Sequence, residues 1–228
     1  MASHLDLEEQ EQLDELKHFW NRYGNLVMGV LIVVLTAYAG WTGWQYWQRD
    51  QAAKAGGVYD ELDRAAQAGD ADRAAKVFAD LQTRYPSTTF AEQGGLVLAR
   101  LQVDRKRLDE ARTSLEWVMA HAGEDEYRAV ARLRLAGLHL EAGRHDEALK
   151  LLGESMPASY APLAADRRGD VLLAQGKRAE AVAAYQEAWK NLDKTVDYRR
   201  LVEAKLTSLG AAPADAEAPA AAASGAAR

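Results

Sequence analysis

The chain has 228 residues, no cysteine and a formal net charge of −6. The absence of cysteine excludes disulfides, a lipoprotein anchor and thiol chemistry, and the net acidity argues against nucleic acid as a partner. At this length, one membrane anchor and one folded domain are the natural organisation.

Residues 1–23 are predicted to form an acidic amphipathic tail. Leu13, Leu16, Trp20 and Tyr23 recur at three- and four-residue steps, and acidic residues occupy the other face. Such a helix either docks a partner at the membrane surface or is a solvated segment that leads into the anchor. Anionic lipid headgroups would repel the acidic face, so any partner of this helix should be a protein.

Residues 24–47 are predicted to form a transmembrane helix. No charged residue lies between Arg22 and Arg49. At a rise of about 1.5 Å per residue, this run is long enough to cross a hydrocarbon core roughly 30 Å thick. A buried core helix is the other interpretation, but nothing else in the chain is apolar enough to enclose it. Aromatic rings, which favour the headgroup level, lie at both ends: Phe19, Trp20, Tyr23, Trp41, Trp44, Tyr46 and Trp47.

A cleavable secretory signal is an alternative interpretation of the same run, because Ala37-Tyr38-Ala39 fits a small-x-small cleavage site. However, the segment before the run is 22 residues long and carries six acidic residues, whereas a signal peptide begins with a short basic segment. We therefore expect an uncleaved anchor. The Lys and Arg residues near its two ends show no clear bias, so charge alone does not predict its orientation.

Four small residues lie along one side of the anchor's second half, in the patterns Thr36-x-x-x-Gly40 and Ala39-x-x-x-Gly43. In lipid, close approach of two backbones over small residues supplies van der Waals contact between helices. Thr36, Ala39, Gly40 and Gly43 are therefore candidates for packing against a partner helix. The alternative is that Gly and Ala are simply common in membrane helices.

Residues 50–209 are predicted to form a tetratricopeptide-like helical-repeat solenoid, so the predicted fold class is all-α. A turn residue is followed by Ala five positions later and by a large apolar residue nine positions later, and this pattern recurs at spacings of 37, 37 and 33 residues. The small residue lets two helices approach closely, and the large one fills the space beside it. The four sets are Gly69/Ala74/Phe78, Lys106/Ala111/Leu115, Gly143/Ala148/Leu152 and Gly176/Ala181/Tyr185.

The end of the chain is predicted to have two parts. A last helix over residues 197–209 should cover the open end of the stack, because an uncapped repeat exposes its apolar face. Residues 210–228 are rich in Ala and Pro and contain no large apolar residue. We expect this tail to be disordered, since it cannot bury enough surface to offset the entropy of ordering.

No catalytic, metal-binding or phosphate-binding motif is present, and the paired acids fall at turns and helix starts, where they act as caps. The sequence therefore predicts a non-enzymatic protein without a cofactor or metal. The Lys and Asn residues with which some repeat proteins clamp a C-terminal carboxylate are missing from the first-helix faces. The candidate groove instead mixes apolar and charged residues, each of which could equally be ordinary surface: Arg100, Leu133, Asp166 and Asp170.

The acidic N-terminal helix, the anchor ending in GWQYW and the segment ADRRGDVLLAQGKRAEA together resemble the YfgM family of ancillary SecYEG translocon subunits, over about residues 10–209. The resemblance implies a single-pass protein of the bacterial inner membrane, with a cytoplasmic N-terminus and a periplasmic repeat domain. It also implies partnership with the SecYEG translocon and with a PpiD-like periplasmic chaperone. The family's cytoplasmic tail is further linked to holding a response regulator of envelope stress.

Three functions remain open at this point. The first is a translocon accessory that helps pass translocated proteins to periplasmic chaperones. The second is a regulatory tether that sequesters a cytoplasmic response regulator through the acidic tail. The third is a scaffold for an envelope assembly complex.

Overall fold

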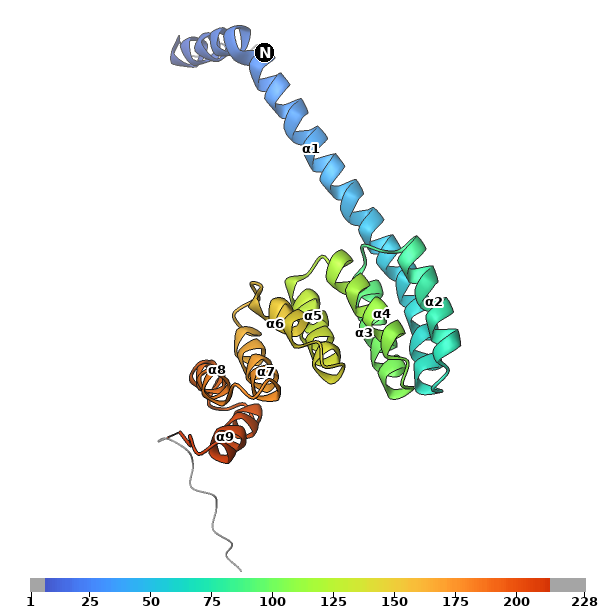
Figure 1. Cartoon of the computed structure of the whole chain (residues 1–228). Coiled ribbons are helices and arrows are strands. Elements are labelled where there is room, and N and C mark those ends of the chain that lie inside the picture. Colours follow the sequence, from blue (N-terminus) through green and yellow to red (C-terminus); the bar gives the residue numbers. More distant parts are fainter. Residues whose placement is uncertain (1–6, 214–228) are drawn as a thin grey trace, which may run out of the picture. The chain divides into compact units, whose positions relative to one another are not determined.

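The computed structural model describes residues 7–213, with side chains for Leu13 and for residues 17–213. All regular structure in this range is α-helical, which confirms the predicted fold class (Figure 1). All six acidic side chains of the tail, and residues 214–228 of the Ala/Pro-rich segment, lie outside the described part. In chain order the helices are α1 (Leu7–Gln67), α2 (Ala71–Arg84), α3 (Thr89–Asp104), α4 (Leu108–His121), α5 (Asp125–Glu141), α6 (His145–Gly153), α7 (Ala161–Ala174), α8 (Arg178–Asn191) and α9 (Tyr198–Ser208).

The chain divides into two compact units, residues 1–53 and residues 54–228. The bounds of α1 include the described part of the predicted tail, the predicted membrane helix and the first helical turns of the second unit. No proline, the residue that removes a backbone donor and breaks a helix, lies within α1. Its Ala55, Leu62 and Ala65 are buried in the first apolar cluster, so the last turns of α1 serve as the first helix of the repeat unit.

The apolar part of α1 is exposed on all sides. Residues 30–35 are between 48% and 67% exposed, and within the described residues α1 is the one helix long and apolar enough to cross a membrane. This exposure contradicts the alternative of a buried core helix. The two threonine hydroxyls bond to backbone oxygens one turn earlier, Thr36 to Ile32 and Thr42 to Tyr38, both at 2.8 Å. Neither hydroxyl therefore requires water, as a lipid environment demands.

The four predicted turns are confirmed by their backbone conformation. Gly69, Lys106, Gly143 and Gly176 have φ angles of 69°, 62°, 71° and 77°, the left-handed region that often ends a helix. Glycine adopts this conformation without a Cβ penalty, and Lys106 is the one non-glycine residue with positive φ in the described chain. The sequence pattern therefore located the turn of each helical hairpin correctly.

The core consists of four apolar clusters that follow one another along the repeat unit. Each draws its buried residues from three consecutive helices, first α1–α3, then α3–α5, α5–α7 and α7–α9. Because neighbouring clusters share a helix, the domain is a solenoid in which each hairpin packs on the next. The Ala and large apolar residues of all four predicted sets are at most 3% exposed: Ala74, Phe78, Ala111, Leu115, Ala148, Leu152, Ala181 and Tyr185.

Helix α9 covers the end of this stack, as predicted. Its Val202 and Leu206 are fully buried against α7 and α8 in the last cluster. The helix thus takes the position that the first helix of a further repeat would occupy.

Candidate functional site

The first helices of successive repeats meet along one face of the repeat unit. On this face Gln93 of α3 donates a hydrogen bond from Nε2 to the hydroxyl oxygen of Tyr127 of α5, over 2.7 Å. Tyr59, in the last turns of α1, packs its ring against Phe90 of α3 with centroids 5.6 Å apart. These cross-helix contacts hold α1, α3 and α5 together and place polar groups of aromatic and amide side chains on one surface, the first-helix face.

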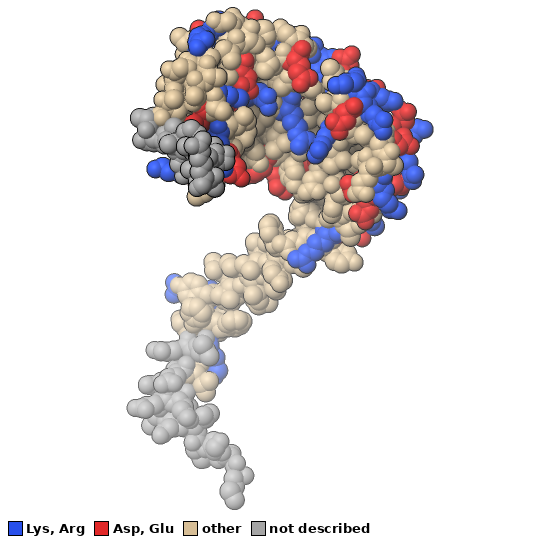
Figure 2. All heavy atoms as spheres, turned by 90° about the horizontal axis from the view of Figure 1, so that it is seen from below, with Lys and Arg blue, Asp and Glu red and all other residues tan. Residues whose placement is uncertain are grey.

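Two arginines lie two turns further along the same helices. Arg100 of α3 is exposed, and Arg134 of α5 donates from Nη1 to the backbone oxygen of Leu96 at 3.0 Å. Partial burial of its guanidinium group, and then the like charge of Arg100, lower the pKa of Arg134. Figure 2 shows basic and acidic side chains interspersed over one side of the repeat unit.

The expectation that Asp166 lines an open groove is wrong, because its side chain is only 1% exposed. Asp166 accepts hydrogen bonds from the Tyr198 hydroxyl at 2.6 Å and from Lys205 Nζ at 2.8 and 2.9 Å. Asp170 accepts from the same Lys205 at 2.6 Å and from the Tyr185 hydroxyl at 2.8 Å. The physical reason is that α9 packs where a further first helix would lie, so this part of α7 faces an interface.

The same cluster perturbs its two tyrosines. Burial, then the hydrogen bond to Asp170, raises the pKa of Tyr185. Burial, then the hydrogen bond to Asp166, raises the pKa of Tyr198 in the same way. Both phenols therefore act as hydrogen-bond donors to carboxylates and stay protonated, which suits a structural role for the cluster.

The predicted groove residues thus fall into different surroundings. Asp166 and Asp170 share one lysine, Arg100 lies on the first-helix face, and Leu133 is half-buried against the cluster formed by α5–α7. Sequence reasoning missed Arg134, which follows Arg100 by 34 residues, the usual repeat length of this class. The turns that precede α4 and α6, at Lys106 and Gly143, are instead 37 residues apart. That spacing makes Gly137 the equivalent of Arg100. Gly137 lies one helical turn from Arg134 on the same side of α5.

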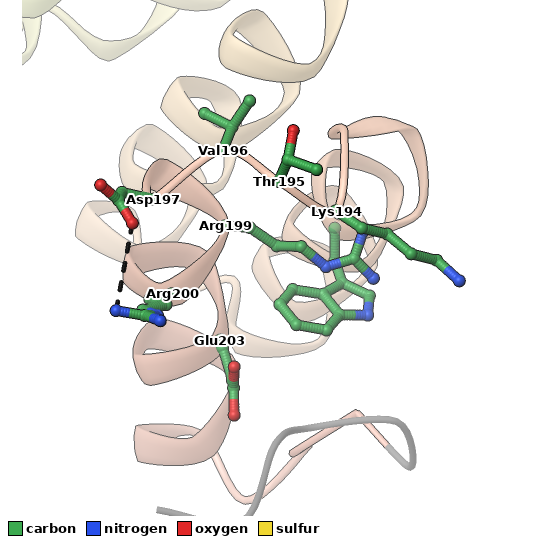
Figure 3. A pocket seen from close by; sticks show the side chains of 8 residues that line it. Lys194, Thr195, Val196, Asp197, Arg199, Arg200 and Glu203 are labelled. Carbon is green, nitrogen blue, oxygen red and sulfur yellow. Dashed lines mark ion pairs between the residues drawn. The ribbon is translucent and has the colours of Figure 1, made fainter.

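A separate hollow lies beside the loop before α9 (Figure 3). The guanidinium group of Arg199 lies 3.8 Å from the ring centroid of Trp189, and its Nη1 donates to the backbone oxygen of Leu192 at 2.9 Å. Arg200 and Asp197 form an ion pair of 4.0 Å at the rim. The two contacts of Arg199 fasten the first turn of α9 to α8 and to Leu192, the residue that follows α8, through cation–π and hydrogen-bond interactions. The hollow is thus explained by structural contacts and needs no ligand.

The predicted packing ridge of the anchor has open space beside it. Within the described part of the chain, an added Cβ at Gly40 or Gly43 would meet no atom within 4 Å, and Thr36 and Ala39 are exposed. The ridge therefore stays a candidate surface for a partner helix.

The described residues contain no group of three or more His, Asp or Glu side chains placed to hold a metal ion. One buried carboxylate lies apart from the first-helix face. Glu92 is 3% exposed, and its Oε1 accepts from the backbone nitrogen of Gly123 at 2.8 Å, while Oε2 has no hydrogen-bond partner. Burial raises the pKa of Glu92. Its single bond fastens α3 to the loop before α5, which is a structural contact.

Comparison with known proteins relates most of the chain to one family. The model of the tetratricopeptide repeat-like domain matches residues 17–211. An ancillary SecYEG translocon subunit of Neisseria gonorrhoeae is 33% identical over 211 residues, which cover 92% of this chain and 100% of that protein. The protein of the same name from Escherichia coli is 29% identical over 88% of this chain and 96% of its own length. That of Haemophilus influenzae is 24% identical over 80% and 89%.

Proposed function

The chain belongs to the family of ancillary SecYEG translocon subunits with a tetratricopeptide repeat-like domain, and we propose that it is a non-enzymatic accessory of the Sec translocon. The observation that carries the proposal is that one chain combines the exposed apolar stretch of α1 with a helical-repeat unit. One segment suits a place in the membrane beside a translocon, and the other suits binding to proteins. The SecYEG translocon is proposed as the partner complex because the relatives are named as its ancillary subunits.

The proposed role is to meet proteins as they leave the translocon and to help pass them to a PpiD-like periplasmic chaperone. This role requires the single-pass anchor to lie in the inner membrane, the N-terminus in the cytoplasm and the repeat domain in the periplasm. The first-helix face supports it, since it offers half-buried apolar side chains beside polar ones, a mixture suited to binding varied peptides. The regulatory tether would depend on acidic side chains before Lys17, which lie outside the described side chains, so no structural observation favours it.

Photocrosslinking in intact membranes tests this role at three positions. A photoreactive residue replacing Gly43 in the anchor should crosslink to a SecYEG subunit. One replacing Val130 on the first-helix face should crosslink to a translocating protein and to the chaperone. One replacing Lys190, exposed on the second helix α8, is the matched control and should give neither product. Capture of translocon and clients by the Lys190 position alone would contradict the proposal.

Topology is tested separately by adding protease to spheroplasts. The repeat domain should be digested while the cytoplasmic tail remains protected. Survival of the repeat domain until the cells are lysed would exclude a periplasmic role, whatever the crosslinks show.

A further inference from the structure

The arginine pair on the first-helix face lacks an acidic partner. No carboxylate among residues 17–213 forms an ion pair with Arg100 or Arg134. Other arginines of α5 are paired, Arg128 with Asp125 and Arg132 with Glu154, the latter at 2.9 Å. Arg134 is therefore the one arginine of α5 without an acidic partner in the described structure, and Arg100 beside it adds a second unpaired positive charge.

Two adjacent cations without an anion repel one another, and the repulsion is unfavourable for the unliganded protein. The hydrogen bond from Arg134 to the Leu96 oxygen holds the α5 guanidinium over α3, the helix that carries Arg100. Burial lowers the pKa of Arg134, and the like charge of Arg100 lowers it further. A bound anion would convert this repulsion into two favourable interactions.

The surroundings of the pair suit a peptide. Gly137, one turn beyond Arg134 on α5, has no atom within 4 Å of the position its Cβ would take, so space is open beside the pair. Val97 and Val130 are half-buried and lie between the arginines and Tyr127 along the two helices. Tyr127 is seven residues from Arg134, which is about 10 Å along a helix. An extended peptide covers that distance with about three residues.

We propose that Arg100 and Arg134 form a carboxylate-binding site that recognises an acidic group of an extended peptide lying along the first-helix face. The guanidinium group presents a planar fork of donors that matches a carboxylate, and two such groups can hold one anion from both sides. The apolar part of the peptide contacts Val97 and Val130. The inference rests on the proposed function in taking this face as the peptide-binding surface, and it adds the chemical class of the ligand.

Fluorescence anisotropy with the full chain in nanodiscs tests the site with three short labelled probes. The first carries aspartates and an amidated C-terminus, the second replaces the aspartates with asparagines, and the third is neutral but ends in a free carboxylate. The first or the third should bind, and the second should bind about tenfold more weakly, the ratio expected for a charged hydrogen bond. Preference for the first assigns acidic side chains as the ligand, and preference for the third assigns a chain terminus.

Arg100→Gln with Arg134→Gln should remove this preference, whereas Arg100→Lys with Arg134→Lys should retain part of it. The charge-matched control is Arg178→Gln with Arg200→Gln, at exposed positions of α8 and α9, which should leave binding unchanged. The single variant Arg100→Gln is included because it should fold normally, since this exposed side chain makes no hydrogen bond in the described structure. Equal affinity for all three probes, or unchanged affinity in the double glutamine variant, would overturn the site.

Failure of the site is distinguishable from failure of the proposed function. Co-purification of SecYEG with the double glutamine variant should equal that of the unchanged protein, because the anchor is intact. Loss of probe selectivity with retained SecYEG supports both statements. Probe selectivity that depends on the two arginines, without any SecYEG recovery from the unchanged protein, supports the site and contradicts the translocon role.

Discussion

The ring of Tyr185 on α8 fills the space that a side chain at Gly169 on α7 would need, since an added Cβ there would lie 2.5 Å from ring carbon Cε1. The ring cannot move away freely, because its hydroxyl donates to Asp170 at 2.8 Å. We therefore expect Gly169→Ala to destabilise the repeat domain by about 1–3 kcal/mol, as overpacking does. Thermal unfolding followed by circular dichroism measures the change.

The control for this prediction is Gly57→Ala in α1, where an added Cβ meets no atom within 4 Å. Alanine ordinarily stabilises a helix interior by about 0.5–1 kcal/mol relative to glycine, so this variant should melt at the same or a higher temperature. If both variants shift the melting temperature upward, α7 and α8 are not in close contact at Gly169.

The turns offer a second prediction, which separates backbone strain from crowding. Gly143 has a φ of 71° and open space around its missing Cβ, so Gly143→Ala should cost about 1 kcal/mol through backbone conformation alone. Lys106 has the same conformation with a φ of 62°. Lys106→Gly should therefore stabilise the domain, by up to about 1 kcal/mol. Urea unfolding of the two variants should show shifts of opposite sign, and shifts of the same sign would contradict the prediction.

The charged cluster beneath α9 gives a third prediction. Lys205→Met would leave Asp166, which is 1% exposed, with the Tyr198 hydroxyl but no cation. Breaking a buried pair in this way typically costs about 3 kcal/mol or more. The exposed Lys190→Met on α8 removes the same charge and should change the unfolding free energy by no more than about 0.5 kcal/mol.

Adding Asp166→Asn to the Lys205→Met variant should restore part of the lost stability, because the buried charge is then removed as well. Chemical denaturation of the three variants measures the recovery. A double variant that is less stable than Lys205→Met would show that the cation is not the partner that Asp166 requires.

A fourth prediction concerns pH and Glu92. Burial, opposed by the Gly123 hydrogen bond, raises the pKa of Glu92 above its ordinary 4.5. Between the ordinary and the raised pKa, the folded protein binds more protons than the unfolded one, so the stability supplied by Glu92 falls as pH rises through this window. Glu92→Gln should remove that fall and should be more stable than the unchanged protein at neutral pH.

The measurement is the urea midpoint at a series of pH values from about 4 upward, the region of ordinary carboxyl titration. Glu141→Gln controls for the loss of one acidic group. This residue is exposed on α5, which like α3 is the first helix of a repeat, and the variant should keep the pH dependence of the unchanged protein. Parallel profiles for Glu92→Gln and the unchanged protein would contradict the prediction.

The repeat architecture was predictable because its signals are local. Positive φ at the turn, a buried Ala five residues later and a large buried residue nine residues later belong to one hairpin, as in Gly176, Ala181 and Tyr185. Each spacing follows from helix geometry alone, so the sequence is enough to predict the repeats. The candidate membrane span is equally local, since the composition and length of one segment identify it.

The candidate site was less predictable because its neighbours lie far apart in the chain. Asp166 looked like a groove residue, but Lys205, 39 residues later, covers it from α9. Arg134 was missed because the turn spacing around α5 differs from the 34-residue step that relates it to Arg100. Whether a polar side chain is open or buried depends on which helix packs over it, and that information is absent from local periodicity.

The last prediction asks whether the anchor is more than a tether. Gly40 lies on the predicted ridge with Thr36, Ala39 and Gly43, and no atom of the described residues fills the space beside it. In lipid, a flat strip of small residues gains stabilisation only if another helix packs against it. Gly40→Ile keeps the helix apolar but raises a branched side chain from the strip. It should leave membrane insertion unchanged and reduce recovery of SecYEG or the chaperone in mild detergent.

Val33→Leu is the matched control, because it lies in the aliphatic part of the same helix, is 67% exposed and also adds bulk. It should preserve both insertion and partner recovery. Only Gly40→Ile places a side chain on the strip of small residues. A difference in partner recovery between the two variants would therefore reflect helix packing rather than hydrophobicity. Quantitative immunoblots of partners, normalised to the anchored protein, give the comparison. Equal recovery with both variants would make the anchor a passive tether and leave recognition to the repeat domain or to the acidic tail.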